Sequence, residues 1–134
     1  MTLHLPAALI AALWAHAHRE APGECVGVIG GTTSTDGLHA TALYPLPNIA
    51  ARPNSEYLAD PGHLLRALKA MDADGQHLIA LYHSHPTGPS WPSPTDARLA
   101  VYPVPHLIAD LQAHTLQAFR LPDGEPVPIY TKSG

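Results

Sequence analysis

The chain contains a single cysteine, Cys25, among its 134 residues. One thiol excludes an internal disulfide bond, and it also excludes zinc ribbons, which need several cysteines. Lysine and arginine together number only seven and form no run, so the sequence lacks the basic patch that is typical of nucleic-acid-binding proteins. We expect a reducing, cytoplasmic setting, because the chain makes no use of disulfide bonds.

Long apolar runs are also missing. The stretch LPAALIAALWAHA near the N-terminus is too short and too interrupted to span a bilayer. No lysine or arginine precedes Arg19, so the cationic segment of a secretory signal peptide is absent. Pro6 favours the first turn of an ordinary helix instead. We therefore expect neither a membrane partner nor a cleaved leader.

The composition and hydrophobic spacing predict one mixed α/β domain over residues 1–134. Apolar residues make up 46% of the chain and charged residues 13%, which is typical of a globular protein of this length. One helix is expected from Pro6 to about Arg19. A second helix should begin at Asp60 and end at Asp74-Gly75. Its expected apolar face consists of Leu64, Leu65, Leu68 and Met71. The expected strands are TLHL, CVGVIGG, LHATALYPLPN, HLIALYHSH, HLIADLQ, TLQAFRL and PVPIYT.

Two His-x-His motifs compete as metal-ligand pairs. With 10 histidines in the chain, roughly one such motif is expected by chance. His16 and His18 lie in the first expected helix, where residues i and i+2 do not face each other. His83 and His85 lie at the end of an expected strand, where residues i and i+2 share a face. The second motif is therefore the candidate metal site.

Asp96 is the candidate third ligand, because a catalytic zinc ion usually has three protein ligands and one position for water. The sequence around it, SPTD, is also a helix-capping box, with Ser93 as the N-cap and Pro94 as the first helical residue. Capping alone explains this spacing as well as metal binding does. Both roles are compatible, since a carboxylate has two oxygens and can serve two partners.

A hydrolytic metal site also needs a general base to take a proton from water. The glutamate candidates are Glu20, Glu24, Glu56 and Glu125. Glu24 directly precedes the expected strand CVGVIGG, which would hold it opposite the end of another strand. A solvated loop carboxylate is the alternative interpretation of Glu24.

Taken together, these residues resemble the JAMM motif: Glu24, then His-Ser-His-Pro from His83 to Pro86, then Ser-x-x-Asp from Ser93 to Asp96. This motif marks the catalytic MPN domain family of zinc isopeptidases, which includes deubiquitinating enzymes. The segments GECVGVIGG, PLPN and DPGHLLRALKAM are also similar to segments of that family, in the expected order. The resemblance implies a single MPN domain of the cytidine-deaminase-like type, with a curved mixed β-sheet flanked by two to three helices.

The same resemblance implies one Zn²⁺ per chain, held by His83, His85 and Asp96. Glu24 would carry a proton from the attacking water to the leaving amine, and Ser93 would donate a hydrogen bond to the developing oxyanion. The implied reaction is hydrolysis of an amide or isopeptide bond after the C-terminal Gly-Gly of a ubiquitin-like or sulfur-carrier protein. A Gly-Gly tail suits a groove that is too narrow for side chains.

The chain departs from the chain-cleaving deubiquitinases in one respect. Only residues 97–134 follow Asp96, which leaves no room for the long insertions that hold ubiquitin in those enzymes. We therefore expect a small ubiquitin-like or sulfur-carrier substrate. Two alternatives stay open, a non-catalytic MPN scaffold and a small-molecule amidase with the same zinc site. The sequence also leaves open the native metal, because two histidines and a carboxylate suit iron as well, and the choice between monomer and homodimer.

Other residues near the motif carry weaker expectations. Cys25 should point away from Glu24 and pack as a small apolar residue instead of acting as a nucleophile. Ser84, between the two histidines, should face away from the metal ligands. Trp91 either contacts substrate or pins the loop to the domain. The remaining histidines are expected to be surface or helix residues.

Overall fold

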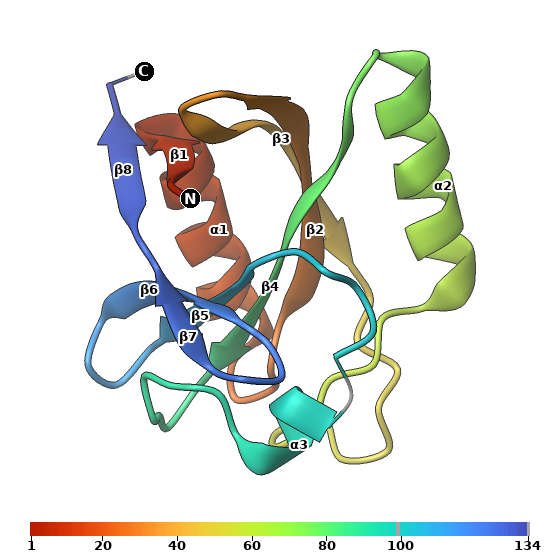
Figure 1. Cartoon of the computed structure of the whole chain (residues 1–134). Helices are drawn as coiled ribbons and strands as arrows, with labels where there is room; N and C mark the ends of the chain where they lie inside the picture. The colour runs from red at the N-terminus through yellow and green to blue at the C-terminus, as the bar shows by residue number, and fades with distance from the viewer. Residues whose placement is uncertain (99, 134) are drawn as a thin grey trace.

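The structure is a computed structural model that describes residues 1–98 and 100–133. Within these residues, eight strands form one mixed sheet in the order β7-β6-β5-β4-β2-β3-β1-β8 (Figure 1). The strands are β1 Leu3–Pro6, β2 Val26–Ser34, β3 Gly37–Leu46, β4 His77–His85, β5 His106–Asp110, β6 Thr115–Arg120, β7 Glu125–Val127 and β8 Ile129–Lys132. The helices are α1 Ala7–Glu20, α2 Pro61–Ala73 and α3 Pro94–Arg98.

The sheet curves strongly, as its two edge strands show. β7 and β8 are separated in sequence only by Pro128, yet they occupy opposite ends of the strand order. The chain therefore passes directly from one edge of the sheet to the other at Pro128. The N–H of Leu3 on β1 donates to the carbonyl oxygen of Pro128 at 2.9 Å. Figure 1 shows β8 rising from β7 toward β1, with α1 and α2 on different sides of the central strands. The predicted mixed α/β fold with a curved sheet is confirmed.

The alternation of side chains at the start of β2 explains how two helices cover the sheet. Cys25 and Ile29 belong to the apolar core that includes residues of α1. Val26 and Val28 belong to a second core that includes residues of α2. Because successive residues of a strand point to opposite faces, one apolar segment supplies both cores. The expectation that Cys25 is a buried core residue is therefore confirmed.

A buried tyrosine fixes α1 against the sheet. Tyr82 on β4 packs across Gly27 on β2, where an added Cβ would lie 2.2 Å from the tyrosine ring, so only glycine fits. The hydroxyl of Tyr82 lies 2.8 Å from Nδ1 of His16 on α1. His16 is consequently buried, whereas His18 is exposed. The two histidines of this motif do not face one point.

Helix α2 begins as predicted, because Oδ2 of Asp60 accepts a hydrogen bond from the N–H of His63 at 2.9 Å. The prediction that Leu65 belongs to the apolar face is wrong, since its side chain is 53% exposed. Successive helical residues are roughly 100° apart, and Leu65 lies beside the buried stripe that contains Ala67 and Met71. No helix in the described part of the chain is long and apolar enough to cross a membrane.

Candidate active site

Two histidines at the end of β4 face the same point. Nε2 of His83 and Nε2 of His85 lie 3.2 Å apart, and both side chains are buried. Their strand pairs with β2 on one side and with β5 on the other, so both neighbours hold it in place. The structure brings the two imidazoles together on one face, as the alternation of a strand predicts.

Asp96 meets both histidines through a single oxygen. Its Oδ2 lies 3.1 Å from Nε2 of His83 and 3.0 Å from Nε2 of His85. The same oxygen accepts a hydrogen bond from the N–H of Ser93 at 2.9 Å, and Oγ of Ser93 accepts one from the N–H of Asp96 at 2.9 Å. This reciprocal pair is the predicted capping box, and it starts α3. Asp96 therefore caps the helix and faces the histidines at the same time.

The hydrogen bond between His85 and Pro89 determines which nitrogen of His85 faces Asp96. Nδ1 of His85 lies 2.7 Å from the carbonyl oxygen of Pro89, which can only accept, so Nδ1 carries a proton. In a neutral imidazole, Nε2 then presents a lone pair to a carboxylate oxygen only 3.0 Å away. Burial lowers the pKa of His85, but the bonds to Asp96 and Pro89 outweigh it and raise the pKa. A proton or a metal ion must lie between these two atoms.

The donor atoms of His83, His85 and Asp96 fit a zinc ion. Their separations of 3.0–3.2 Å match the distance of about 3.3 Å between ligands that each bind a tetrahedral zinc ion at 2.0–2.1 Å. The hydrogen bond from His85 to the Pro89 carbonyl is the outer contact that usually orients a metal-binding imidazole. Two imidazoles and one carboxylate leave a fourth position for water.

Glu24 lies beside these atoms, immediately before β2. A ligand oxygen of Glu24 and one nitrogen each of His83 and His85 all lie within 4.8 Å of one another. The Glu24 side chain is 6% exposed, and its Oε1 is buried without a hydrogen-bond partner among the described residues. Burial raises the pKa of its carboxyl group to about 7, although nearby His85 lowers it. A buried, unpaired oxygen with this pKa is suited to exchange protons at neutral pH.

Asn48 holds the backbone of Glu24, a role that the sequence analysis did not identify. Nδ2 of Asn48 donates to the carbonyl oxygens of Glu24 at 2.9 Å and of Glu56 at 3.0 Å. Its Oδ1 accepts from the N–H groups of Ala50 and Leu58, both at 3.0 Å. The side-chain amide therefore ties the loop between β3 and α2 to the segment that carries Glu24. The segment PLPN contains Asn48, but its sequence does not indicate which distant residues the side chain contacts.

Other buried residues surround the two histidines. Oγ of Ser84 accepts a hydrogen bond from the N–H of Cys25 at 2.7 Å, so Ser84 faces away from the candidate ligands as predicted. The ring of Tyr57 stacks on His83, with centroids 4.3 Å apart. His106 on β5 is buried, and neither ring nitrogen has a partner within the described part of the chain. Burial lowers the pKa of His106 to about 4, so the expectation of a surface or helix histidine is wrong here.

A narrow pocket opens beside the candidate ligands. Its volume is about 150 Å³, and its lining consists of Glu24, Asn54, Ser55, His85, Pro86, Thr87, Gly88, Pro89 and Ser93. Oγ of Ser90 donates to Oδ2 of Asp110 at 2.6 Å, which anchors the proline-rich loop to β5. Trp91 is 63% exposed, so its side chain is not buried against the domain and is free to contact a ligand.

Comparisons with known proteins agree with this arrangement. Residues 6–122 match a family model described as prokaryotic homologs of the JAB domain. A probable TtuB-protein conjugate cleaving protease of Thermus thermophilus is 41% identical over 129 residues, which cover 96% of this chain and 82% of that protein. The CysO-cysteine peptidase of Mycobacterium tuberculosis is 33% identical over 135 residues, covering 95% and 90% of the two chains. The solution structure of a Desulfitobacterium hafniense protein matches with a TM-score of 0.88 and 31% identity, over 100% of this chain and 94% of that one. The chain therefore belongs to the family of prokaryotic homologues of the JAB domain, as its motif predicts.

Proposed function

We propose that this protein is a zinc-dependent peptidase that hydrolyses the amide or isopeptide bond after the C-terminal Gly-Gly of a small ubiquitin-like or sulfur-carrier protein. The observation that carries the proposal is the buried oxygen of Glu24, which has no hydrogen-bond partner among the described residues and lies beside three converging ligand atoms. Two relatives support the reaction class, since one is named for cleaving TtuB-protein conjugates and the other is named a CysO-cysteine peptidase. We place the activity in the reducing cytoplasm, because the single thiol is buried and unpaired.

His83, His85 and Asp96 would hold the zinc ion, through the three atoms that already converge in the structure. A bound zinc ion would lower the pKa of water to about 7 and polarise the substrate carbonyl. The raised pKa of Glu24 makes its carboxylate basic enough to take a proton at neutral pH. The protonated Glu24 can then deliver that proton to the leaving nitrogen, so one residue acts first as base and then as acid.

Ser93 would stabilise the oxyanion without giving up its capping bond. Its Oγ accepts the N–H of Asp96, which uses one lone pair and leaves the hydroxyl hydrogen free to donate. Ser93 also lines the narrow pocket together with Glu24 and His85. A donor aimed at the developing negative charge contributes about 2.7–4 kcal/mol in comparable hydrolytic sites.

The small volume of the pocket favours a substrate tail that has no side chains. Its volume of about 150 Å³ is well below the roughly 300–1,000 Å³ of typical small-molecule sites. Its lining includes Pro86, Gly88 and Pro89 of the proline-rich loop, together with Asn54 and Ser55 of the loop between β3 and α2. A Gly-Gly segment adds no side-chain volume, so it is the substrate tail that such a small space favours.

The test uses a small sulfur-carrier protein that ends in Gly-Gly and is fused through its C-terminus to a reporter amine. Zinc-loaded enzyme should release the reporter by hydrolysis directly after the second glycine. Removing the metal with a chelator should stop the reaction, and added zinc should restore it. A matched fusion that ends in Ala-Ala serves as the control and should resist cleavage.

Two results would contradict the proposal. Cleavage of small amides alone, with the fusion intact, would show a small-molecule amidase. No cleavage of either substrate by zinc-loaded protein would indicate a non-catalytic scaffold, and a search for binding partners would follow.

A further inference from the structure

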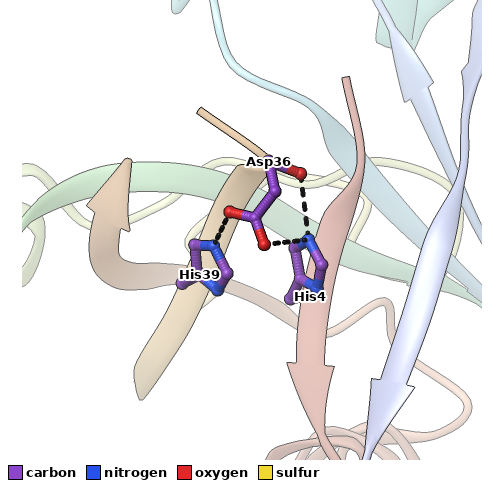
Figure 2. A group of neighbouring side chains, drawn as sticks. All are labelled: His4, Asp36 and His39. Atoms are coloured by element: carbon purple, nitrogen blue, oxygen red, sulfur yellow. Dashed lines mark hydrogen bonds and ion pairs between the residues drawn. The ribbon is translucent and has the colours of Figure 1, made fainter. Parts of the chain in front are cut away.

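A second group of metal-ligating side chains lies at the end of β2 that is distant from Glu24. His4 on β1 and His39 on β3 are paired residues of neighbouring parallel strands, so they project from the same face. Asp36 lies in the turn between β2 and β3. Figure 2 shows both imidazoles directed at this aspartate. One ligand atom from each of the three residues lies within 4.8 Å of the others.

The contacts in this group concentrate nitrogen and oxygen donors around one point. Nε2 of His39 lies 2.8 Å from Oδ1 of Asp36 and 2.9 Å from Oγ of Ser34. Nε2 of His4 lies 3.1 Å from the backbone oxygen of Asp36 and 3.9 Å from its Oδ2. Ser34 also bonds to Asp36 directly. Asp36 is exposed and the two histidines are half-buried, so solvent reaches the group from the side of the turn.

We propose that His4, Asp36 and His39 form a second, weaker binding site for a divalent transition metal such as Zn²⁺. Imidazole and carboxylate ligands suit zinc, nickel and copper ions, and solvent can complete the coordination shell. The ion would join the β2–β3 turn to β1 and β3, and such binding stabilises the folded chain over the unfolded chain. The site shares no residue with the candidate active site and does not depend on the proposed activity.

Two features of the group explain why this site is the weaker one. The rings of His4 and His39 are stacked, with centroids 4.3 Å apart and planes at 10°, so both must tilt before their lone pairs meet one ion. Nζ of Lys132 lies 3.0 Å from Nδ1 of His39. An ammonium group can only donate, so it favours the form of His39 whose proton is on Nε2. Metal binding requires Lys132 to move away and this proton to leave Nε2.

The experiment is a calorimetric titration of the whole, chelator-stripped protein with Zn²⁺. A second, weaker equivalent should bind after the first. The double variant His4→Ala/His39→Ala and the single variant Asp36→Asn should each lose the second equivalent and keep the first. Asp36 lies in an exposed turn, so its replacement by asparagine leaves the core intact. Histidine ¹⁵N spectra of the wild type should show His4 and His39 shifting in the second step.

His63→Ala is the matched control, because it removes another exposed histidine–aspartate pair, with Asp60, and should leave both equivalents unchanged. Lys132→Met removes a positive charge beside His39 and should tighten the second step by about two- to fivefold, as expected for a partly buried charge contact near the surface. The inference is overturned if binding stops after one equivalent. It is also overturned if Asp36→Asn and the double variant both retain the second equivalent, which would place it elsewhere on the surface.

Discussion

Replacing Asn48 with alanine removes four hydrogen bonds, of which one joins the loop between β3 and α2 to the backbone of Glu24 and three lie within that loop. Two of them run from Nδ2 to the carbonyl oxygens of Glu24 and Glu56, at 2.9 and 3.0 Å. The other two run to Oδ1 from the N–H groups of Ala50 and Leu58, both at 3.0 Å. Alanine has no polar side-chain atom and can form none of these hydrogen bonds. We expect a less stable fold and a displaced general base.

The size of the effect follows from these contacts. Each hydrogen bond contributes about 0.5–1.5 kcal/mol net, so four bonds set a range of about 2–6 kcal/mol. Asn48 is only partly buried, and water can reach some of the released groups, so we expect the lower part, about 2–4 kcal/mol. With a urea m-value of about 2 kcal/mol/M, the unfolding midpoint should fall by about 1–2 M. A misplacement of Glu24 by about 1 Å would also lower turnover up to about 10²-fold.

The assay compares urea unfolding, zinc content and turnover for Asn48→Ala and the wild type. The zinc content should be unchanged, because the candidate ligands His83, His85 and Asp96 lie on β4 and α3. Asn54→Ala, in the exposed part of the same loop, is the stability control and should change the free energy of unfolding by less than about 0.5 kcal/mol. If Asn48→Ala lowers the free energy of unfolding by less than about 0.5 kcal/mol and keeps normal turnover, the role assigned to this amide is refuted.

Other predictions concern the candidate catalytic residues and the metal. Glu24→Gln keeps the shape of the side chain but cannot accept a proton, so turnover should fall about 10²–10⁴-fold with zinc retained; near-normal turnover would exclude it as the base. Ser93→Ala should lower turnover about 10²–10³-fold for a lost oxyanion donor, whereas a loss of only about 1 kcal/mol in stability, with full turnover, would reduce it to an N-cap. Zinc affinity should fall as the pH drops, because the raised pKa of His85 keeps a proton where the metal binds, while the pKa of Asp96 is lowered and that carboxylate stays ionised. Calorimetry in buffers of different ionisation enthalpy should then detect about one proton released per zinc ion at a pH below the pKa of His85, and no release would contradict this assignment.

The parts of the site that follow local periodicity could be predicted from the sequence. His83 and His85 share a face because a strand alternates, and Asp96 lies near Ser93 because a capping box fixes residues three apart. The strand at CVGVIGG follows from its β-branched residues. The start of α2 follows from the local pair Asp60-Pro61. Each of these features depends on neighbours within one element.

The remaining parts depend on contacts between distant segments, which no local spacing encodes. Asn48 bonds to Glu24 across 24 positions, and Tyr57 stacks on His83 from a loop without regular structure. His106 looked like a surface histidine, but its strand lies between β4 and β6, which buries the ring. Leu65 is an apolar residue in a helix, and its spacing alone predicts a buried side chain. Its exposure depends on which side of α2 packs against the sheet, and Leu65 faces solvent.

The central claim is that His83, His85 and Asp96 bind one metal ion, and metal analysis tests it most directly. The wild type and His85→Ala are loaded with zinc, passed through metal-free buffer to remove weakly held ions, and measured by mass spectrometry. We predict about one tightly held zinc ion per chain in the wild type and its loss in His85→Ala. Equal zinc contents in the two proteins, or no retained metal in either, would contradict the claim.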